Sequence, residues 1–275
     1  MRYAEAVATA PPGSRCFRAR DLARLGRSTL NQLFTPGPAA PPLEDVAAAL
    51  AEESEALEAV ALALSAPRRR RLLLLSRRPV APNWREDAAR RLVRGSFWYL
   101  AYELEPELWD RLAASEPIAP ELLEALPAEG ARVLDVGAGT GRLAASLQPR
   151  AAVLVGVEPS PPLRRMLRAR LPGVRVVAGH GQRLPIRSGW ADLVVSCGTF
   201  GPHPPLGGEV VRAELERCAR PGGAVALVEP EDRAWWRSRG YAVTRYPVPE
   251  AHLDPEVHDF FGPPRPPHHL LLKRL

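Results

Sequence analysis

Apolar and polar residues alternate along the second half of the chain in blocks that predict strands and helices in turn. Short blocks rich in Val, Leu and Ala are expected to form buried strands, at residues 131–136, 152–158, 173–179, 191–197 and 223–230. Amphipathic segments between them are expected to form helices, at 137–147, 160–170 and 208–220. Strands without a polar face, separated by helices, are typical of a parallel sheet covered on both sides. The pattern therefore predicts a doubly wound α/β fold.

Two further strand candidates lie near the end of the chain. The segments 239–248 and 268–275 are apolar enough to pair with the sheet, and a short helix through Trp235 and Trp236 is expected before them. With these additions we expect a mostly parallel sheet of seven strands.

The first 118 residues show helical spacing instead. One acidic amphipathic helix is expected over 43–64, and a Trp- and Tyr-bearing helical stretch over 85–114. Residues 67–94 hold ten arginines and two acids, including the run Arg68–Arg71. We expect this run to form a solvated face, or an arginine-flanked strand paired with the acids at 44–58. The chain is thus expected to divide into a mostly helical region, 1–118, and a sheet domain, 119–275.

Composition excludes several classes of protein. The 275 residues are 46% hydrophobic and 25% charged, which is an ordinary globular balance. No apolar run approaches the roughly 20 residues that span a bilayer. The first residues lack the apolar centre of a signal peptide, so we expect a cytoplasmic protein. Three cysteines without Cys-x-x-Cys spacing argue against a disulfide framework or a zinc ribbon.

The net charge and the spacing of the histidines bear on whether the protein binds nucleic acid or a metal ion. The net charge of +6 raises the possibility of a nucleic-acid partner, but lysine occurs once and the arginines of the second half are scattered. No metal site is expected, because four histidines share no ligand spacing with cysteines or clustered acids: His252, His258, His268 and His269.

A glycine-rich turn follows the first predicted strand of the sheet. Gly137, Gly139 and Gly141 stand at two-residue spacing, and Asp135 precedes them at the strand end. Glycine allows a tight turn and a close approach of the backbone to a ligand. The spacing departs from the dinucleotide fingerprint G-x-G-x-x-G. A carboxylate at Asp135 would repel a pyrophosphate and attract an ammonium or sulfonium group, so the turn predicts a cationic ligand.

A second acid, Glu158, ends the next predicted strand. There a carboxylate can accept hydrogen bonds from both hydroxyls of a ribose. Two acids at the ends of adjacent strands bracket a space the size of a nucleoside.

These motifs, in this order, resemble those of class I S-adenosylmethionine-dependent methyltransferases, in the broad branch that includes quinone-biosynthesis and natural-product enzymes. The resemblance covers roughly residues 120–275 and rests on VLDVGAGTGRLA, GVEPSPPLRRMLR, GHGQRLPI, ADLVVSCGTF and LERCARPGGAVALVEP. It implies a Rossmann-like domain that uses S-adenosyl-L-methionine as cofactor. It also implies that Asp135 and the three glycines surround the methionine end, with Glu158 on the ribose and Pro159 against the adenine.

Two further positions follow from the resemblance. His180 occupies the place where the family usually has an acid that accepts from the adenine amino group, and Gly181 follows it. A neutral imidazole can accept that hydrogen bond, whereas an imidazolium cannot. Cys197 falls where the fourth motif lines the methyl-donor end.

Methyl transfer from a sulfonium needs mainly alignment, so a catalytic base is optional. His203, at the expected mouth of the site, could deprotonate an acceptor hydroxyl. Related enzymes often cap the cofactor site with the segment before the first motif, so Tyr99 and Trp109 are the aromatic residues expected to contact the acceptor. No (Asp/Asn)-Pro-Pro-(Tyr/Phe) follows the fourth strand, which argues against methylation of planar amide or exocyclic amino nitrogens.

The favoured prediction is a methyltransferase acting on a small molecule, and two alternatives stay open. The arginine run Arg68–Arg71 would suit an RNA or protein methyltransferase. The replaced acid at His180 would suit a non-catalytic protein that keeps the fold for assembly or regulation.

Overall fold

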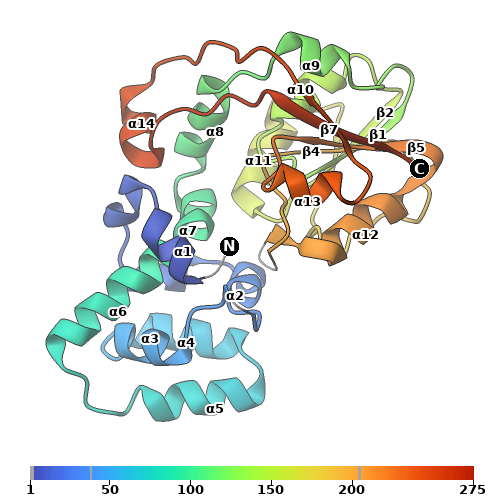
Figure 1. The fold of residues 1–275 in the computed structure, drawn as a ribbon. Helices are drawn as coiled ribbons and strands as arrows, with labels where there is room; N and C mark the ends of the chain where they lie inside the picture. The colour runs from blue at the N-terminus through green and yellow to red at the C-terminus, as the bar shows by residue number, and fades with distance from the viewer. Residues whose placement is uncertain (1–2, 38, 204–205) are drawn as a thin grey trace. The chain divides into compact units, whose positions relative to one another are not determined.

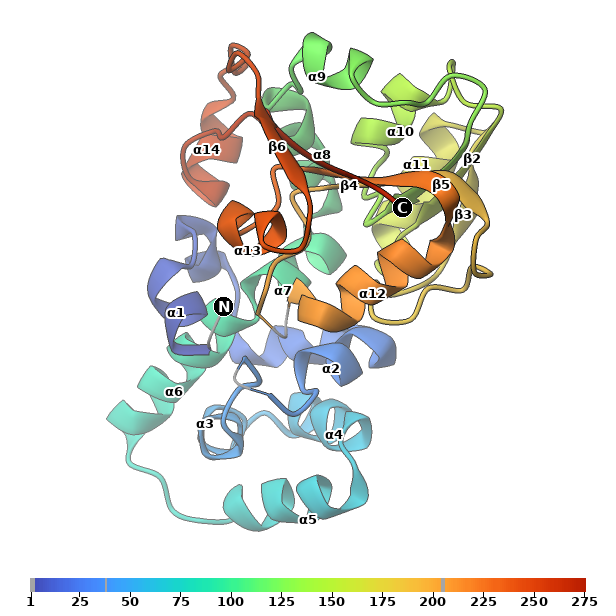
Figure 2. The same cartoon turned by 45° about the vertical axis from the view of Figure 1, so that its right-hand side comes forward.

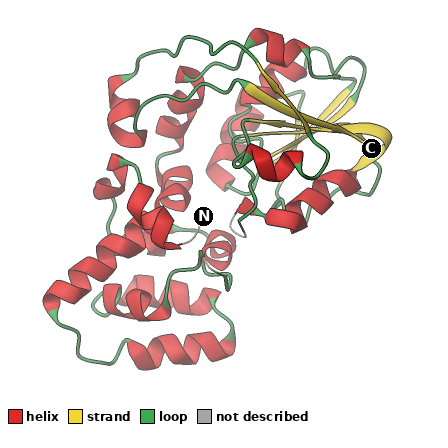
Figure 3. Cartoon of the chain, viewed as in Figure 1, coloured by secondary structure: helices red, strands yellow, loops and turns green. Residues whose placement is uncertain are grey.

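The computed structural model describes residues 3–37, 39–203 and 206–275. They form two compact units, Met1–Trp109 with Pro255–Pro263, and Asp110–Asp254 with Pro264–Leu275. The strands all belong to the second unit, as the yellow arrows of Figure 3 show. The boundary between the units lies between residues 109 and 110, inside one helix, whereas the sequence pattern predicted it between residues 118 and 119. A segment from the C-terminal region, Pro255–Pro263, belongs to the first unit.

Short helices build the first unit (Figure 1). Their bounds are α1 (Tyr3–Thr9), η1 (Pro12–Cys16), η2 (Ala19–Arg24), α2 (Arg27–Leu33), α3 (Leu43–Ala49), α4 (Ser54–Ala63), α5 (Ala66–Leu75), α6 (Pro82–Gly95), α7 (Phe97–Leu104), α8 (Pro106–Ser115) and α14 (Pro255–Phe261). Helix α14 belongs here because Phe260 packs on Phe17 and Phe97, with ring centroids 5.9 and 5.6 Å away. A Cβ at Gly13 would lie 2.6 Å from the Phe260 ring, so α14 packs directly against the backbone of η1.

The single helix expected over 43–64 is in fact two helices, α3 and α4. The chain leaves the helical conformation at Leu50, with φ −108° and ψ 9°, and this side chain is fully buried. Helix α3 packs on α6, whereas α4 packs on η2, so each helix buries its own apolar face. The apolar positions continue through the break, which is why their spacing did not reveal it.

The run Arg68–Arg71 lies in helix α5, so the expectation of a strand is wrong. Arg68 and Arg69 donate hydrogen bonds to backbone carbonyls at the C-terminal ends of α2 and α4. Arg71 forms an ion pair with Glu44, an acid of the predicted partner segment. Three of the four guanidinium groups therefore stabilise the packing of this unit.

The second unit contains a seven-stranded sheet within the described residues. Its strands are β1 (Arg132–Val136), β2 (Val153–Val157), β3 (Arg175–Val177), β4 (Ala191–Cys197), β5 (Ala219–Val228), β6 (Ala242–Arg245) and β7 (His269–Arg274). Their order is β3-β2-β1-β4-β5-β7-β6. Strands β1 to β5 are mutually parallel, and β7 runs antiparallel between β5 and β6 (Figure 2). The predicted mostly parallel sheet is confirmed.

Helices cover both faces of this sheet. Side chains alternate between faces along each strand, so Val133 and Leu134 enter different cores. One core contains α9 (Pro120–Glu124), α10 (Arg142–Leu147) and α11 (Pro161–Arg170). The other contains α12 (Gly208–Cys218) and α13 (Arg233–Arg237). The fold is therefore doubly wound, as predicted. No helix of the described segments is both long and apolar enough to cross a membrane.

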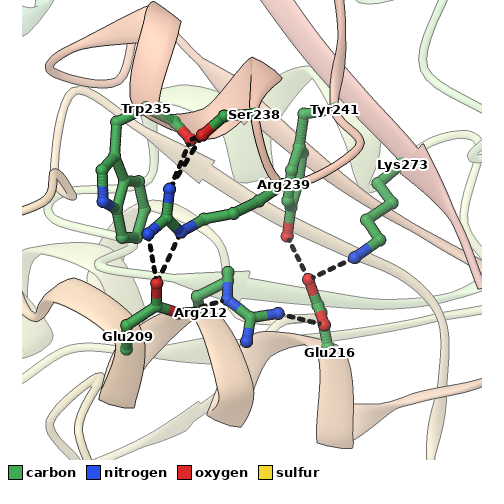
Figure 4. Close-up of polar contacts among 8 residues, drawn as sticks. All are labelled: Glu209, Arg212, Glu216, Trp235, Ser238, Arg239, Tyr241 and Lys273. Atoms are coloured by element: carbon green, nitrogen blue, oxygen red, sulfur yellow. Dashed lines mark hydrogen bonds and ion pairs between the residues drawn. The ribbon is translucent and has the colours of Figure 1, made fainter.

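A polar network fastens α12 to the antiparallel edge of the sheet (Figure 4). Glu216 of α12 accepts hydrogen bonds from Arg212 at 2.7 Å, Lys273 at 2.9 Å and the Tyr241 hydroxyl at 3.2 Å. Burial alone would raise the pKa of Glu216, but Lys273 and Arg212 hold it below its usual value. Beside it, the Arg239 guanidinium lies 3.8 Å from the centre of a Trp235 ring. The ionised Glu216 thus connects one helix to β7 and to the residue before β6.

Replacing Glu216 by alanine is expected to lower the free energy of unfolding by about 2 kcal/mol, because the Lys273 ammonium and the Tyr241 hydroxyl lose their acceptor. Urea unfolding measures the change. Glu209→Ala is the matched control on the same helix, since Glu209 pairs with Arg212 and Arg239 at the exposed surface. Equal loss of stability in the two variants would contradict the assigned role of Glu216.

Candidate cofactor site

The candidate site lies at the carboxyl edge of the parallel strands. Strand order reverses at β1, which has β2 and β3 on one side and β4 and β5 on the other. Such a switch point leaves a crevice between the loops that follow the two central strands. Asp135 lies on β1, Glu158 directly follows β2, and Cys197 ends β4. The fold therefore gathers at one edge the three polar positions that the motifs singled out.

The turn after β1 depends on glycine at two points in particular. Gly141 has φ 100° and is the N-cap residue of α10, and a Cβ there would lie 2.7 Å from a methyl carbon of Leu167. Gly137 has φ 75°, and its Cβ would lie 2.9 Å from the Thr199 side chain. The Gly137 amide also donates to the Val157 carbonyl at 2.8 Å. The turn is therefore held against the end of β2 and cannot accept side chains at these positions.

Glu158 spans the space between the two strand ends. Its side chain is nearly buried, with 5% exposure. One carboxylate oxygen accepts from the Gly139 amide at 2.9 Å, and the other accepts from the Ser160 amide at 2.8 Å. An ionised carboxylate only accepts hydrogen bonds, which is the role that ribose hydroxyl groups require of a partner. The backbone thus fixes the orientation of the Glu158 carboxylate, and its role toward a ribose stays a prediction.

Asp135 is the most deeply buried acid of the site, with 1% exposure. Its Oδ2 atom has no hydrogen-bond partner among the described residues. Burial, and then the charge of Glu158, raise the pKa of Asp135 to about 7, against the opposing effect of the Ala144 backbone amide. A buried carboxyl with an unused oxygen is costly to ionise without a cation. This arrangement fits a ligand that carries an ammonium group.

The positions expected around the adenine lie near one arginine. Arg164 of α11 donates to the carbonyls of Glu158 and Pro159 at 2.7 and 2.5 Å. Burial, together with the charge of Arg164, lowers the pKa of His180. The imidazole is therefore neutral near pH 7, which is the form that can accept a hydrogen bond. A Cβ at Gly181 would lie 2.7 Å from the Phe200 ring, so this position has no space for a side chain.

Cys197 is not positioned as a reactive thiol. Burial raises the pKa of its thiol to about 11, so it stays protonated near neutral pH. Its backbone carbonyl accepts from the Thr199 hydroxyl at 2.8 Å. A contribution of Cys197 to the site would come from its backbone and its shape.

The contacts described above involve none of the three residues suggested for catalysis and acceptor binding. The His203 side chain is exposed in the loop after β4, beside residues 204–205, which lie outside the described part. Tyr99 packs on the core of the first unit, where burial raises its pKa to about 12. Trp109 contacts Tyr102, with ring centroids 4.7 Å apart, and Phe261. Their roles toward an acceptor stay predictions.

Sequence reasoning missed the residues that hold the site in shape. Thr199 fills the space beside Gly137, Ser160 orients Glu158, and Arg164 fixes the turn after β2. The sequence could have pointed to them only through their positions, because each lies within a few residues of a strand end that carries a predicted site residue. Their partners became visible only when the strands were placed side by side.

Comparison with known proteins agrees with this geometry. Residues 133–223 match the family described as a methyltransferase domain. An uncharacterized methyltransferase of Mycobacterium tuberculosis is 35% identical over 132 residues, which cover 46% of this chain and 52% of that protein. A demethylmenaquinone methyltransferase of Beutenbergia cavernae is 35% identical over 115 residues, covering 41% of this chain and 47% of that protein.

Among solved structures, a Haloferax volcanii methyltransferase in complex with the Trm112 methyltransferase activator is similar with a TM-score of 0.46 and 19% identity, covering 64% of this chain and 95% of that one. The chain spans about half the length of the curated relatives it matches. The matched segment contains the glycine turn, Glu158 and Cys197, which are the elements of the site described above. Residues 133–223 of the sheet unit therefore match a methyltransferase domain, which supports the predicted resemblance to class I S-adenosylmethionine-dependent methyltransferases.

Proposed function

We propose that this protein transfers a methyl group from S-adenosyl-L-methionine to a small-molecule acceptor by in-line displacement. The observation that carries the proposal is the pair Asp135 and Glu158 at the ends of adjacent strands. Asp135 offers a buried, unpartnered oxygen, and Glu158 is held by two backbone amides. These two environments suit the ammonium group and the ribose diol of one ligand.

The residues of the chain act mainly by positioning. The bound cofactor would supply an electrophilic methyl group on a positively charged sulfur. Asp135 would hold the ammonium group, Glu158 the ribose hydroxyls, and neutral His180 the adenine amino group. Fixing the donor in this way converts an encounter of two molecules into a reaction within one complex, which is the main source of rate for this chemistry. His203 is the candidate proton acceptor for a hydroxyl nucleophile.

Three observations favour a small-molecule acceptor. The sequence after β4 reads Gly198-Thr199-Phe200, without the prolines typical of enzymes that methylate planar nitrogens. In α5, Arg68, Arg69 and Arg71 already bind carbonyls or Glu44, which leaves them less free to bind RNA phosphates. The relatives include a protein named for demethylmenaquinone methylation, which is a small-molecule reaction.

Calorimetric titration with S-adenosylmethionine and with its demethylated product tests the proposal. We expect both to bind one site per chain with a Kd on the order of 10 μM. NAD is the control ligand, since Asp135 would repel its pyrophosphate. Absence of heat with both sulfur nucleosides, in a folded protein, would overturn the proposal and favour a non-catalytic role for the fold.

A further inference from the structure

We propose that Glu229, His268 and His269 form a binding site for a divalent transition-metal ion. Glu229 directly follows β5, and His269 begins β7. The site lies at the same end of the sheet as Cys197, because Cys197 pairs with Val228 in the β4–β5 ladder. The proposal does not depend on the methyltransferase activity.

The antiparallel pairing of β5 with β7 brings these residues together. Val228 is opposite Leu270, so the next residues along the ladder are Glu229 and His269. The Glu229 amide donates to the His269 carbonyl at 2.9 Å. Glu229 adopts φ 46°, a left-handed conformation that is uncommon for a residue other than glycine. Sequence spacing predicted no metal site because the acid lies far from the histidines along the chain.

Two of the three donor-atom separations are close to those of metal ligands. Glu229 Oε2 lies 3.1 Å from His269 Nδ1 and 3.5 Å from His268 Nδ1. One ligand atom from each residue lies within 4.8 Å of the others. A tetrahedral zinc ion with bonds of about 2.0 Å separates its nitrogen and oxygen ligands by about 3.3 Å. Small rotations of the two imidazole rings would therefore complete a three-ligand site.

The surroundings fix the carboxylate for this role. Arg233 donates to Oε1 of Glu229 at 2.9 Å, and His269 Nδ1 lies 3.1 Å from both carboxylate oxygens. The backbone amides of His268 and His269 both donate to Oε2 at 3.1 Å. Hydrogen bonds of this kind to a ligating carboxylate orient it toward the ion. The three side chains are 13–24% exposed, so an ion can reach them from solvent.

The ligand chemistry identifies the class of ion. Two imidazoles and one carboxylate suit Zn²⁺, Co²⁺ or Ni²⁺ better than Mg²⁺ or Ca²⁺, which prefer oxygen ligands. The His268 Nδ1 atom lies 3.0 Å from the Pro266 carbonyl. Because a carbonyl only accepts, this nitrogen carries a proton in the metal-free protein, and metal binding would move that proton to Nε2. Three protein ligands leave an open position for water or another oxygen ligand.

Titration of the metal-free protein with Co²⁺, followed by visible absorption, tests the site. The background is Cys16→Ser, because Cys16 is an exposed free thiol that could bind metal by itself. We expect one ion per chain, with the intense d–d bands of a site of low coordination number, and displacement by Zn²⁺. Glu229→Gln and His269→Ala should each weaken binding by at least about 100-fold. His252→Ala is the control, since this exposed histidine lies outside the cluster.

Circular dichroism of the metal-free variants establishes that they are folded. If a variant is unfolded, His268→Ala replaces it in the comparison. Co²⁺ binding of equal strength in the Cys16→Ser background and in a folded Glu229→Gln variant would overturn the proposal, as would the absence of any binding. Titration of the metal-free protein with S-adenosylmethionine reports separately on the cofactor site, so the failures of the two proposals are distinguishable.

Discussion

Glu158→Ala is expected to weaken the binding of S-adenosylmethionine by roughly 100-fold or more. The carboxylate would accept two ribose hydroxyls, and a hydrogen bond to a charged group contributes about 1.5–3 kcal/mol. Two such bonds at the lower value give about 3 kcal/mol, and each 1.4 kcal/mol is a factor of ten in Kd. The substitution also releases the Gly139 and Ser160 amides, which weakens the preformed shape of the turn. Calorimetric titration measures the change.

Two further variants test whether the loss of affinity comes from the contact between Glu158 and the ribose. Glu158→Gln keeps the shape of the side chain but loses its charge, so an intermediate affinity is expected. Glu129→Ala removes an exposed acid before β1, at the opposite end of that strand, and should leave the affinity unchanged. Wild-type affinity in a folded Glu158→Ala variant would show that the ribose is bound elsewhere.

A component of the free energy of unfolding of the ligand-free protein is expected to fall as pH rises from about 4 to about 7, because Asp135 loses its proton. Asp135→Asn should abolish this component. The pKa of Asp135 is about 7 in the folded protein, above its usual value of 3.8. The folded state therefore keeps a proton that the unfolded state releases in this range. Protonated Asp135 therefore makes its full contribution to the free energy of unfolding below pH 4, and this contribution is lost as pH rises through 7. A shift of this size corresponds to on the order of 4 kcal/mol.

Urea unfolding at pH 5 and pH 8 measures this component. Relative to the wild type, Asp135→Asn should gain stability between pH 5 and pH 8. S-adenosylmethionine should restore much of the wild-type stability at pH 8, because its ammonium group would stabilise the ionised carboxylate. Asp110→Asn should show no such trend between pH 5 and pH 8, because burial would raise the pKa of Asp110 but Arg170 holds it below its usual value, so this carboxyl is ionised throughout that range. Parallel pH profiles of Asp135→Asn and the wild type would refute the assignment.

The sheet and the centre of the site were predictable because their signals are local. A buried parallel strand is a short apolar block, and each block of the second half became a strand. Asp135 and Glu158 end two consecutive blocks, and the parallel pairing of β1 with β2 places them together without further information. The glycines were readable for the same reason, since the turn needs residues without a Cβ at fixed offsets from the strand end.

The remaining features depend on contacts between distant residues. The break at Leu50 arises because α3 and α4 pack on different neighbours, and no proline or glycine marks it. The pairing of Glu229 with His269 depends on β7 entering the sheet next to β5, which residue spacing does not express. Thr199 and Arg164 likewise gain their partners only through the turns that surround them.

The placement of α14 limits how this protein can be cut into fragments. A fragment beginning at Asp110 would retain every strand but would carry Phe260 without Phe17 and Phe97. Exposed rings of this size favour self-association. A fragment ending at Trp109 would in turn have a hole where Phe260 belongs. Producing the sheet unit by itself would therefore need a short synthetic linker from Asp254 to Pro264, with α14 deleted.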